Sequence, residues 1–215
     1  IIFDIAGTEL SCPTGNGAAD GTITFSNPTG GNGVGGGGLG GPYQYSIDAG
    51  LTYQALPTFT GLTSGVYTVY VKDGNGCEGQ STITLDEPDA YNIIDNTTPL
   101  TCNGNNTGFI QIIANGATSP YSFDLDGTTN ITGIYPSLAS NPAYNLTVTD
   151  DNNCIFTTTI DVQEPTLLQS TYVVTDANCN GECDGQIDVN ATGGIPTYLY
   201  SADNGITYQA SDVLT

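Results

Sequence analysis

The chain has 215 residues and carries 22 acidic residues against one basic residue, for a formal net charge of −21. Such an acidic surface repels phosphate backbones and anionic lipid, which argues against nucleic-acid binding. Charged residues are only 11% of the chain and hydrophobic residues are 38%, so we expect a folded protein rather than a disordered acidic tail. It has no Met and no apolar run long enough for a membrane span, so we expect part of a longer protein without membrane insertion.

The chain repeats itself. The stretch GVYTVYVKDGNGCEGQSTITLDEP, from Gly65 to Pro88, returns as AYNLTVTDDNNCIFTTTIDVQEP, from Ala143 to Pro165. Self-similarity at a fixed period is the signature of a repeat architecture. We expect the third copy to be truncated at Thr215. The predicted units are 1–90, with a Gly-rich insertion at 29–41, then 91–167, and 168–215 as the N-terminal part of a third repeat.

Each predicted unit contains two recognisable early strands. The first alternates polar and apolar residues after an Asp-Gly or Thr-Gly pair, in Asp20–Phe25, Thr107–Ile112 and Asp184–Val189. The second follows a proline and carries alternating aromatics, in Pro42–Asp48, Pro120–Asp126 and Pro196–Asp203. Short alternating strands separated by Gly, Asn and Asp turns, with no helical periodicity, are typical of all-β sandwiches. The sequence therefore predicts tandem immunoglobulin-like β-sandwich repeats, each clipped by a disulfide.

The segment from Leu62 to Asp73 resembles the entry to the penultimate strand of an immunoglobulin-like sandwich. A tyrosine there donates its hydroxyl to an upstream backbone carbonyl and forms a tyrosine corner. Tyr67 and the corresponding Tyr144 are the candidates, with plain core packing as the alternative. Both roles are structural.

The cysteines are expected to form disulfides. The chain has no His and no Cys-x-x-Cys spacing, which argues against zinc, and disulfides indicate an oxidising, extracellular compartment. Pairing within each repeat, at about 4 kcal/mol per bond in the chain-entropy model, accounts for the cysteines without catalysis. The predicted pairs are Cys12 with Cys77 and Cys102 with Cys154. Cys179 is expected to pair with a cysteine beyond Thr215, and a local bond between Cys179 and Cys183 is the alternative.

No enzyme is expected from this sequence. Without His, the Ser-His and Cys-His nucleophile systems are unavailable, and the paired carboxylates recur where Asp is favoured in turns. No cofactor is expected, although hard carboxylate oxygens in an extracellular protein are also calcium ligands. The calcium candidates are Asp73, Asp124, Asp126, Asp150 and Asp151, with solvated turn carboxylates as the alternative.

The full motif resembles one known family. Its best-matched parts are Cys-Asn-Gly at Cys102 and Cys179, Asp-Gly-Asn-Gly-Cys ending at Cys77, and the Glu-Pro pairs that end at Pro88 and Pro165. The combination is similar to the SprB-type repeat of large cell-surface adhesins in gliding Bacteroidetes. The resemblance implies export by a type IX secretion system, display at the cell surface as a long filament, and partners in the gliding machinery. Unit one departs from it with SCPTGNG in place of Cys-Asn-Gly, and unit two has Pro142 in place of the Gly of Gly-x-Tyr.

The leading hypothesis is therefore a structural and adhesive repeat segment of a secreted surface filament that contacts neighbouring repeats and an external surface or polysaccharide. One alternative is a carbohydrate-binding module array of a polysaccharide-degrading enzyme, which would need exposed aromatic platforms. Tyr53 and Tyr208 are the surplus aromatics, and Trp is absent. The other alternative is an inert spacer or sheath filament.

Overall fold

The computed structural model describes residues 1–13, 19–31, 43–179, 181 and 184–214. Within those ranges the chain forms strands β1 to β16 and no helix, which confirms the all-β prediction. The part described accordingly has no helical segment suited to crossing a membrane. Most of the predicted Gly-rich insertion, and Cys183, lie outside the described residues.

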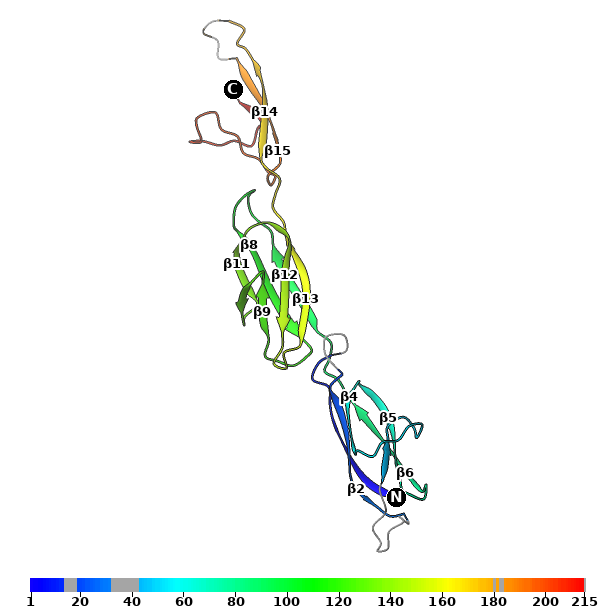
Figure 1. Ribbon diagram of the computed structural model, residues 1–215. Helices are drawn as coiled ribbons and strands as arrows, with labels where there is room; N and C mark the ends of the chain where they lie inside the picture. The colour runs from blue at the N-terminus through cyan, green and yellow to red at the C-terminus, as the bar shows by residue number, and fades with distance from the viewer. Residues whose placement is uncertain (14–18, 32–42, 180, 182–183, 215) are drawn as a thin grey trace. The chain divides into compact units, whose positions relative to one another are not determined.

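The first two sheets are antiparallel and have the strand order of an immunoglobulin-like sandwich (Figure 1). One sheet has the order β1-β2-β4 and the other the order β3-β5-β6. These are the A-B-E and C-F-G positions of that fold. The strands are β1 (Ile2–Thr8), β2 (Gly21–Thr29), β3 (Gln44–Ser46), β4 (Thr58–Leu62), β5 (Gly65–Lys72) and β6 (Glu78–Leu85).

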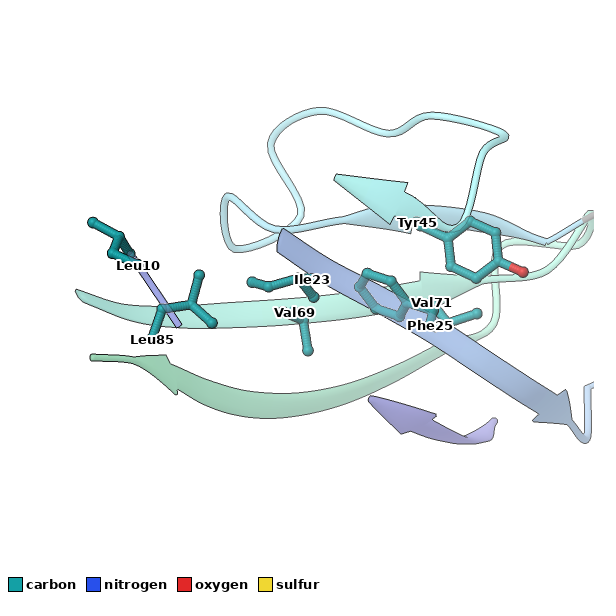
Figure 2. Packing of buried hydrophobic residues seen from close by; sticks show 7 residues of the cluster. All are labelled: Leu10, Ile23, Phe25, Tyr45, Val69, Val71 and Leu85. Carbon is teal, nitrogen blue, oxygen red and sulfur yellow. The ribbon is translucent and has the colours of Figure 1, made fainter. Parts of the chain in front are cut away.

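The core of this sandwich is built by alternate residues of facing strands. Ile23 of β2 and Val69 of β5 are fully buried. Figure 2 shows Leu10 beside Leu85 at one end of the cluster and Tyr45 at the other. The period-two alternation seen in the sequence therefore places one face of each strand in the core. The whole cluster consists of Leu10, Ile23, Phe25, Tyr45, Val69, Val71 and Leu85.

The next two sheets repeat this arrangement with one added strand. Their orders are β11-β8-β7 and β10-β9-β12-β13, so β10 extends the second sheet at its edge. Residues at the repeated positions are again buried, among them Ile110 of β8 and Leu146 of β12. The strands are β7 (Asn92–Thr98), β8 (Gly108–Asn115), β9 (Ser122–Leu125), β10 (Thr128–Asn130), β11 (Ile134–Leu138), β12 (Asn141–Thr149) and β13 (Ile155–Val162).

The last sheet has the order β14-β15-β16, which matches β1-β2-β4. Its strands are β14 (Gln169–Thr175), β15 (Gln186–Thr192) and β16 (Val213–Leu214). Ile187 of β15 is 37% exposed, whereas the matching Ile23 of β2 is completely buried. The described residues after β13 thus form the first sheet of a sandwich with its apolar face open.

The chain also divides into two compact units that do not follow the sequence repeats. Their borders cut across strands β7, β8, β9, β12 and β13, so the repeat boundaries after residues 90 and 167 stay predictions. Unit 1 comprises Ile1–Ile93, Ala114–Phe123 and Thr147–Thr157, and unit 2 comprises Ile94–Ile113, Asp124–Leu146 and Thr158–Thr215.

Candidate functional site

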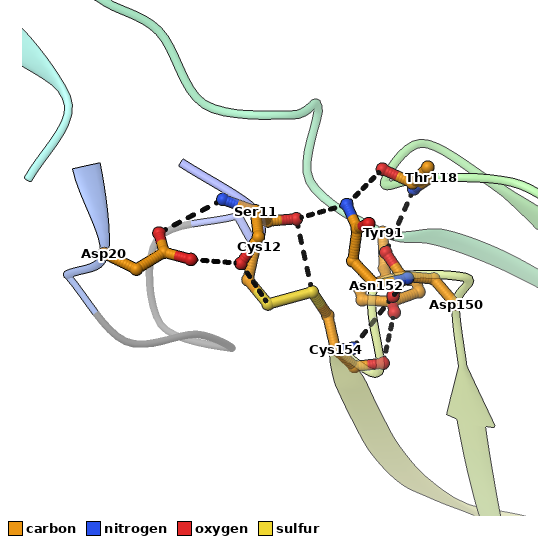
Figure 3. Close-up of a disulfide and its surroundings, with 8 residues drawn as sticks. All are labelled: Ser11, Cys12, Asp20, Tyr91, Thr118, Asp150, Asn152 and Cys154. Carbon is orange, nitrogen blue, oxygen red and sulfur yellow. Dashed lines mark hydrogen bonds between the residues drawn. A yellow bond between two sulfur atoms is a disulfide. The ribbon is translucent and has the colours of Figure 1, made fainter. Parts of the chain in front are cut away.

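The structure contains a disulfide that the sequence analysis did not predict. Cys12 is bonded to Cys154, with 5.6 Å between their Cα atoms, and both residues belong to compact unit 1 (Figure 3). Cys77, Cys102 and Cys179 carry free, exposed thiols. The predicted pairs Cys12–Cys77 and Cys102–Cys154 are therefore wrong, and no disulfide bridges the two sheets of one sandwich among the described residues. The alternative involving Cys183 lies outside the part that the structure describes.

Cys12 and Cys77 cannot meet because they lie at opposite ends of β6. Cys77 directly precedes this eight-residue strand. Cys12 lies at its far end, where the backbone N–H of Leu10 donates to O of Asp86 at 3.1 Å. At about 3.3 Å per residue the strand separates its ends by about 25 Å, far beyond the ~7 Å that two bonded Cα atoms can span.

The same geometry separates Cys102 from Cys154. Cys154 directly precedes β13, which also has eight residues. Cys102 lies beyond the end of that strand, where the backbone N–H of Leu100 donates to O of Gln163 at 2.9 Å. A β-sandwich therefore holds its two repeat cysteines at opposite ends, and neither sandwich can bond its own pair.

A buried aspartate holds Cys154 in place. Asp150 is only 5% exposed, and its Oδ1 accepts hydrogen bonds from the backbone N–H of Asn152 at 2.9 Å and of Cys154 at 2.8 Å. Its Oδ2 accepts a third bond from the backbone N–H of Thr118 at 3.1 Å. Because the local turn and a distant loop share one carboxylate, the sulfur of Cys154 is presented from a fixed backbone.

The Cys12 side is fixed by a second carboxylate. The hydroxyl and backbone N–H of Ser11 both donate to the side chain of Asp20. Both hydrogen bonds, above all the one from the hydroxyl, lower the pKa of the Asp20 carboxyl from its ordinary value of 3.8. The Ser11 hydroxyl also lies 3.7 Å from Sγ of Cys12. The segment before the cysteine is thereby tied to the start of β2.

Further polar contacts join the two sides of the bridge (Figure 3). The side-chain amide of Asn152 donates to O of Ser11 at 2.9 Å and to Oγ1 of Thr118 at 3.1 Å. The hydroxyl of Tyr91 donates to O of Cys154 at 2.7 Å. Burial, with a contribution from the nearby Asp150 charge, raises the pKa of Tyr91 to about 12, so the phenol stays a donor at neutral pH. The bridge thus lies within a hydrogen-bonded cluster.

The calcium candidates take part in different local contacts. Oδ1 of Asp73 accepts two backbone hydrogen bonds in its turn, as that of Asp150 does. Asp124 accepts from the backbone N–H of Gly127 at 2.9 Å, and Asp126 accepts from the side-chain amide of Asn145 at 2.7 Å. Asp151 donates its backbone N–H to O of Thr118. Within the described ranges, no three acidic, Cys or His side chains gather as a metal site would require. Calcium binding stays an untested prediction.

Both tyrosine-corner candidates make an upstream hydrogen bond. The hydroxyl of Tyr67 donates to O of Thr63 at 2.9 Å, and that of Tyr144 donates to O of Ala139 at 3.1 Å. Each tyrosine lies near the start of the central strand of its second sheet, β5 or β12. This is the position and the bond that define a tyrosine corner.

The aromatic residues considered for a carbohydrate platform differ in their surroundings. Tyr53 is half-buried, donates to Oε1 of Glu78 at 2.7 Å and has Nζ of Lys72 3.6 Å from its ring centre. The matching Tyr208 is 63% exposed. Since Tyr53 is covered by the single basic side chain of the protein, the two positions do not form a repeated exposed platform.

One feature of the sequence marks part of this site. An aspartate stands four residues before Cys77 and again before Cys154, and in both places it hydrogen-bonds to the cysteine backbone. This pattern identifies a built turn around each cysteine, although it does not reveal the bonding partner. The contacts of Ser11 with Asn152 had no signal in the sequence.

A protein-family model described as the SprB repeat matches residues 94–130 and residues 171–207. The two matches lie in the second and third predicted repeats and cover the opening Cys-Asn-Gly of each. A search of curated proteins found no match to this chain. The repeated sandwich strands, the two matches and the quoted motifs agree. The chain therefore contains SprB-type repeats at these two places.

Proposed function

We propose that this chain is a structural and adhesive segment of a large secreted filament that mediates adhesion to surfaces and gliding motility. The observation that carries the proposal is the Cys12–Cys154 bond, which joins cysteines of two different sequence repeats. Such a bond strengthens the connection along a tandem array. The two matches to the SprB repeat support the same interpretation.

The proposed location is the outer cell surface. Stable disulfides form in oxidising compartments, and the repeat family is one of extracellular, cell-surface proteins. A net charge of −21 keeps neighbouring filaments apart and soluble. Export by a type IX secretion system, and attachment to the gliding machinery, are part of the proposal through the family.

Adhesion by such an array would come from many weak contacts. Each repeat contributes length and one copy of its surface, and linked copies bind with an avidity that exceeds any single contact. The proposed partners are neighbouring repeats of the same chain and an external surface or polysaccharide.

Deleting the gene that encodes the chain tests the proposal in cells. We expect loss of attachment to glass and of gliding, both restored by the complete gene. Cells that attach and glide normally after deletion would favour the inert spacer. Binding of the purified chain to a defined glycan, lost on Tyr208→Ala, would instead favour a carbohydrate-binding module.

A further inference from the structure

Cys77 lies in the same hydrogen-bonded turn that presents Cys154. Oδ1 of Asp73 accepts from the backbone N–H of Asn75 at 2.9 Å and of Cys77 at 2.8 Å, the same distances as in the Asp150 turn. The backbone N–H of each aspartate donates to O of its cysteine, at 3.0 Å for Cys77 and 3.1 Å for Cys154. The Cys77 turn is therefore a second copy of the Cys154 half of the bridge, with its thiol free and exposed.

Cys102 has in the second sandwich the position that Cys12 has in the first. A buried leucine stands two residues before each cysteine, Leu10 before Cys12 and Leu100 before Cys102. Its backbone N–H donates to the carbonyl oxygen of the residue that follows the last strand of the sandwich, at 3.1 Å for Leu10 and 2.9 Å for Leu100. The residue directly before each cysteine also donates its backbone N–H to a side-chain oxygen. Ser11 donates to Oδ1 of Asp20 at 3.1 Å, and Thr101 donates to Oγ1 of Thr107 at 2.9 Å. Cys102 is thus a second copy of the Cys12 half of the bridge, also with a free and exposed thiol.

The segments that lead into the second and third predicted repeats also make the same backbone contacts. The backbone N–H of Ala117 donates to O of Asp89 at 2.6 Å, and that of Gly194 donates to O of Thr166 at 2.7 Å. The residue before each donor is a glycine with φ of 77° or 76°, where a Cβ would lie 2.0 or 2.1 Å from a carbonyl oxygen of the incoming segment. The same close backbone approach is therefore required at both places.

We propose that the opening cysteine of each repeat bonds to the Gly-Cys-type cysteine of the repeat that follows it. Cys12–Cys154 is one bond of this kind, and Cys77 and Cys102 are the two opposite half-sites for further bonds to adjacent repeats. The register places the partner position for Cys102 beyond Thr215. Pairing within a sandwich is blocked by the separation of about 25 Å along one strand. The inference stands independently of the adhesive role.

The chemistry is ordinary thiol–disulfide exchange. One cysteine thiolate attacks a disulfide oxidant, which forms a mixed disulfide and expels one thiolate of the oxidant. The second cysteine then attacks the mixed disulfide, closes the protein bond and expels the second thiolate. Two protein thiols become one disulfide, the oxidant accepts two electrons, and the two protons go to the released thiols.

A series of such bonds changes how tension passes along the array. Residues between two bonded cysteines cannot extend while the bond is intact. The force therefore passes from the end of one sandwich to the start of the next through sulfur rather than through the peptide segment alone. This assigns the cysteines a role between repeats instead of within them.

An extended chain tests the proposal. The 215-residue chain is extended after Thr215 by a second copy of residues 61–88. Thr215 aligns with Thr60, so these residues supply the two strands that correspond to β5 and β6 and a Gly-Cys cysteine. The native Cys77 is changed by Cys77→Ser, so that the grafted cysteine is unique. The chain is refolded with oxidised and reduced glutathione, alkylated, digested without reduction and mapped by mass spectrometry. We expect a linked peptide that joins Cys102 to the grafted cysteine.

The control carries serine in place of the grafted cysteine, and there Cys102 should be fully alkylated. A Cys102 that stays alkylated in the extended chain, although Cys12–Cys154 has formed, would overturn the proposal. The unextended protein gives a second measurement that does not depend on the graft. It should yield a linked Cys12–Cys154 peptide with Cys77 and Cys102 alkylated, and a linked Cys12–Cys77 or Cys102–Cys154 peptide would overturn the assignment.

Discussion

Breaking the Cys12–Cys154 bond should lengthen the chain that can be pulled out under force. The bond joins residues 142 positions apart, so the intervening chain cannot extend while it is intact. At about 3.3–3.6 Å per extended residue, Cys154→Ser should add about 470–510 Å to the unfolded length. In the chain-entropy model, a loop of this size also stabilises the folded protein by about 5 kcal/mol, which the variant should lose.

Single-molecule stretching between handles at the two termini measures this length. The oxidised protein and Cys154→Ser are compared, and reduction of the unmodified protein should give the same increase. Cys77→Ser is the matched control, because that thiol is already free and should leave the length unchanged. If Cys77→Ser instead freed the 65 residues that separate it from Cys12, about 215–235 Å, the bonds would lie within repeats and the reasoning would be refuted.

Three further predictions concern local features. Tyr67→Phe removes the hydroxyl bond to Thr63 and should lower the free energy of unfolding by about 1 kcal/mol in a urea titration, whereas an unchanged value would deny the corner a stabilising role. Hydrogen bonds from Thr52, above all the one from its hydroxyl, lower the pKa of the Asp48 carboxyl from 3.8 to about 2. The stability that these bonds contribute is therefore complete above pH ~4 and is lost as the pH falls through 2. Carboxyl NMR titration should give that pKa and a higher one in Thr52→Val; equal values would exclude Thr52 as the cause. The calcium hypothesis predicts that millimolar Ca²⁺ raises the melting temperature and that Asp124→Asn reduces the rise, and an unchanged melting temperature removes it.

The strands could be predicted from the sequence because the alternation of polar and apolar side chains is a local pattern. The predicted strand Asp20–Phe25 overlaps β2 from Gly21 onwards, and Thr107–Ile112 overlaps β8 closely. Strand ends were less accurate, since Pro42–Asp48 contains only the short β3 (Gln44–Ser46). Alternation reports which face of a strand is buried, whereas pairing with a neighbouring strand decides where it ends.

The candidate site was only half accessible from sequence. The turn residues around Cys77 and Cys154 repeat in the sequence, because an aspartate that caps its own turn acts over four residues. The bonding partners do not, since spacing along the chain gives no distance in space. The predicted pairs join the two cysteines of one repeat, whereas an eight-residue strand separates these two cysteines in each sandwich.

The sequence by itself determined the all-β class and the repeated unit, and it indicated that cysteines of this chain form disulfides. These follow from side-chain alternation, turn residues and composition, all of which are local or additive. Only the tertiary structure decided which cysteines meet. In each sandwich one cysteine directly precedes the last strand and the other lies near the far end of that strand, so spacing along the chain could not decide the pairing.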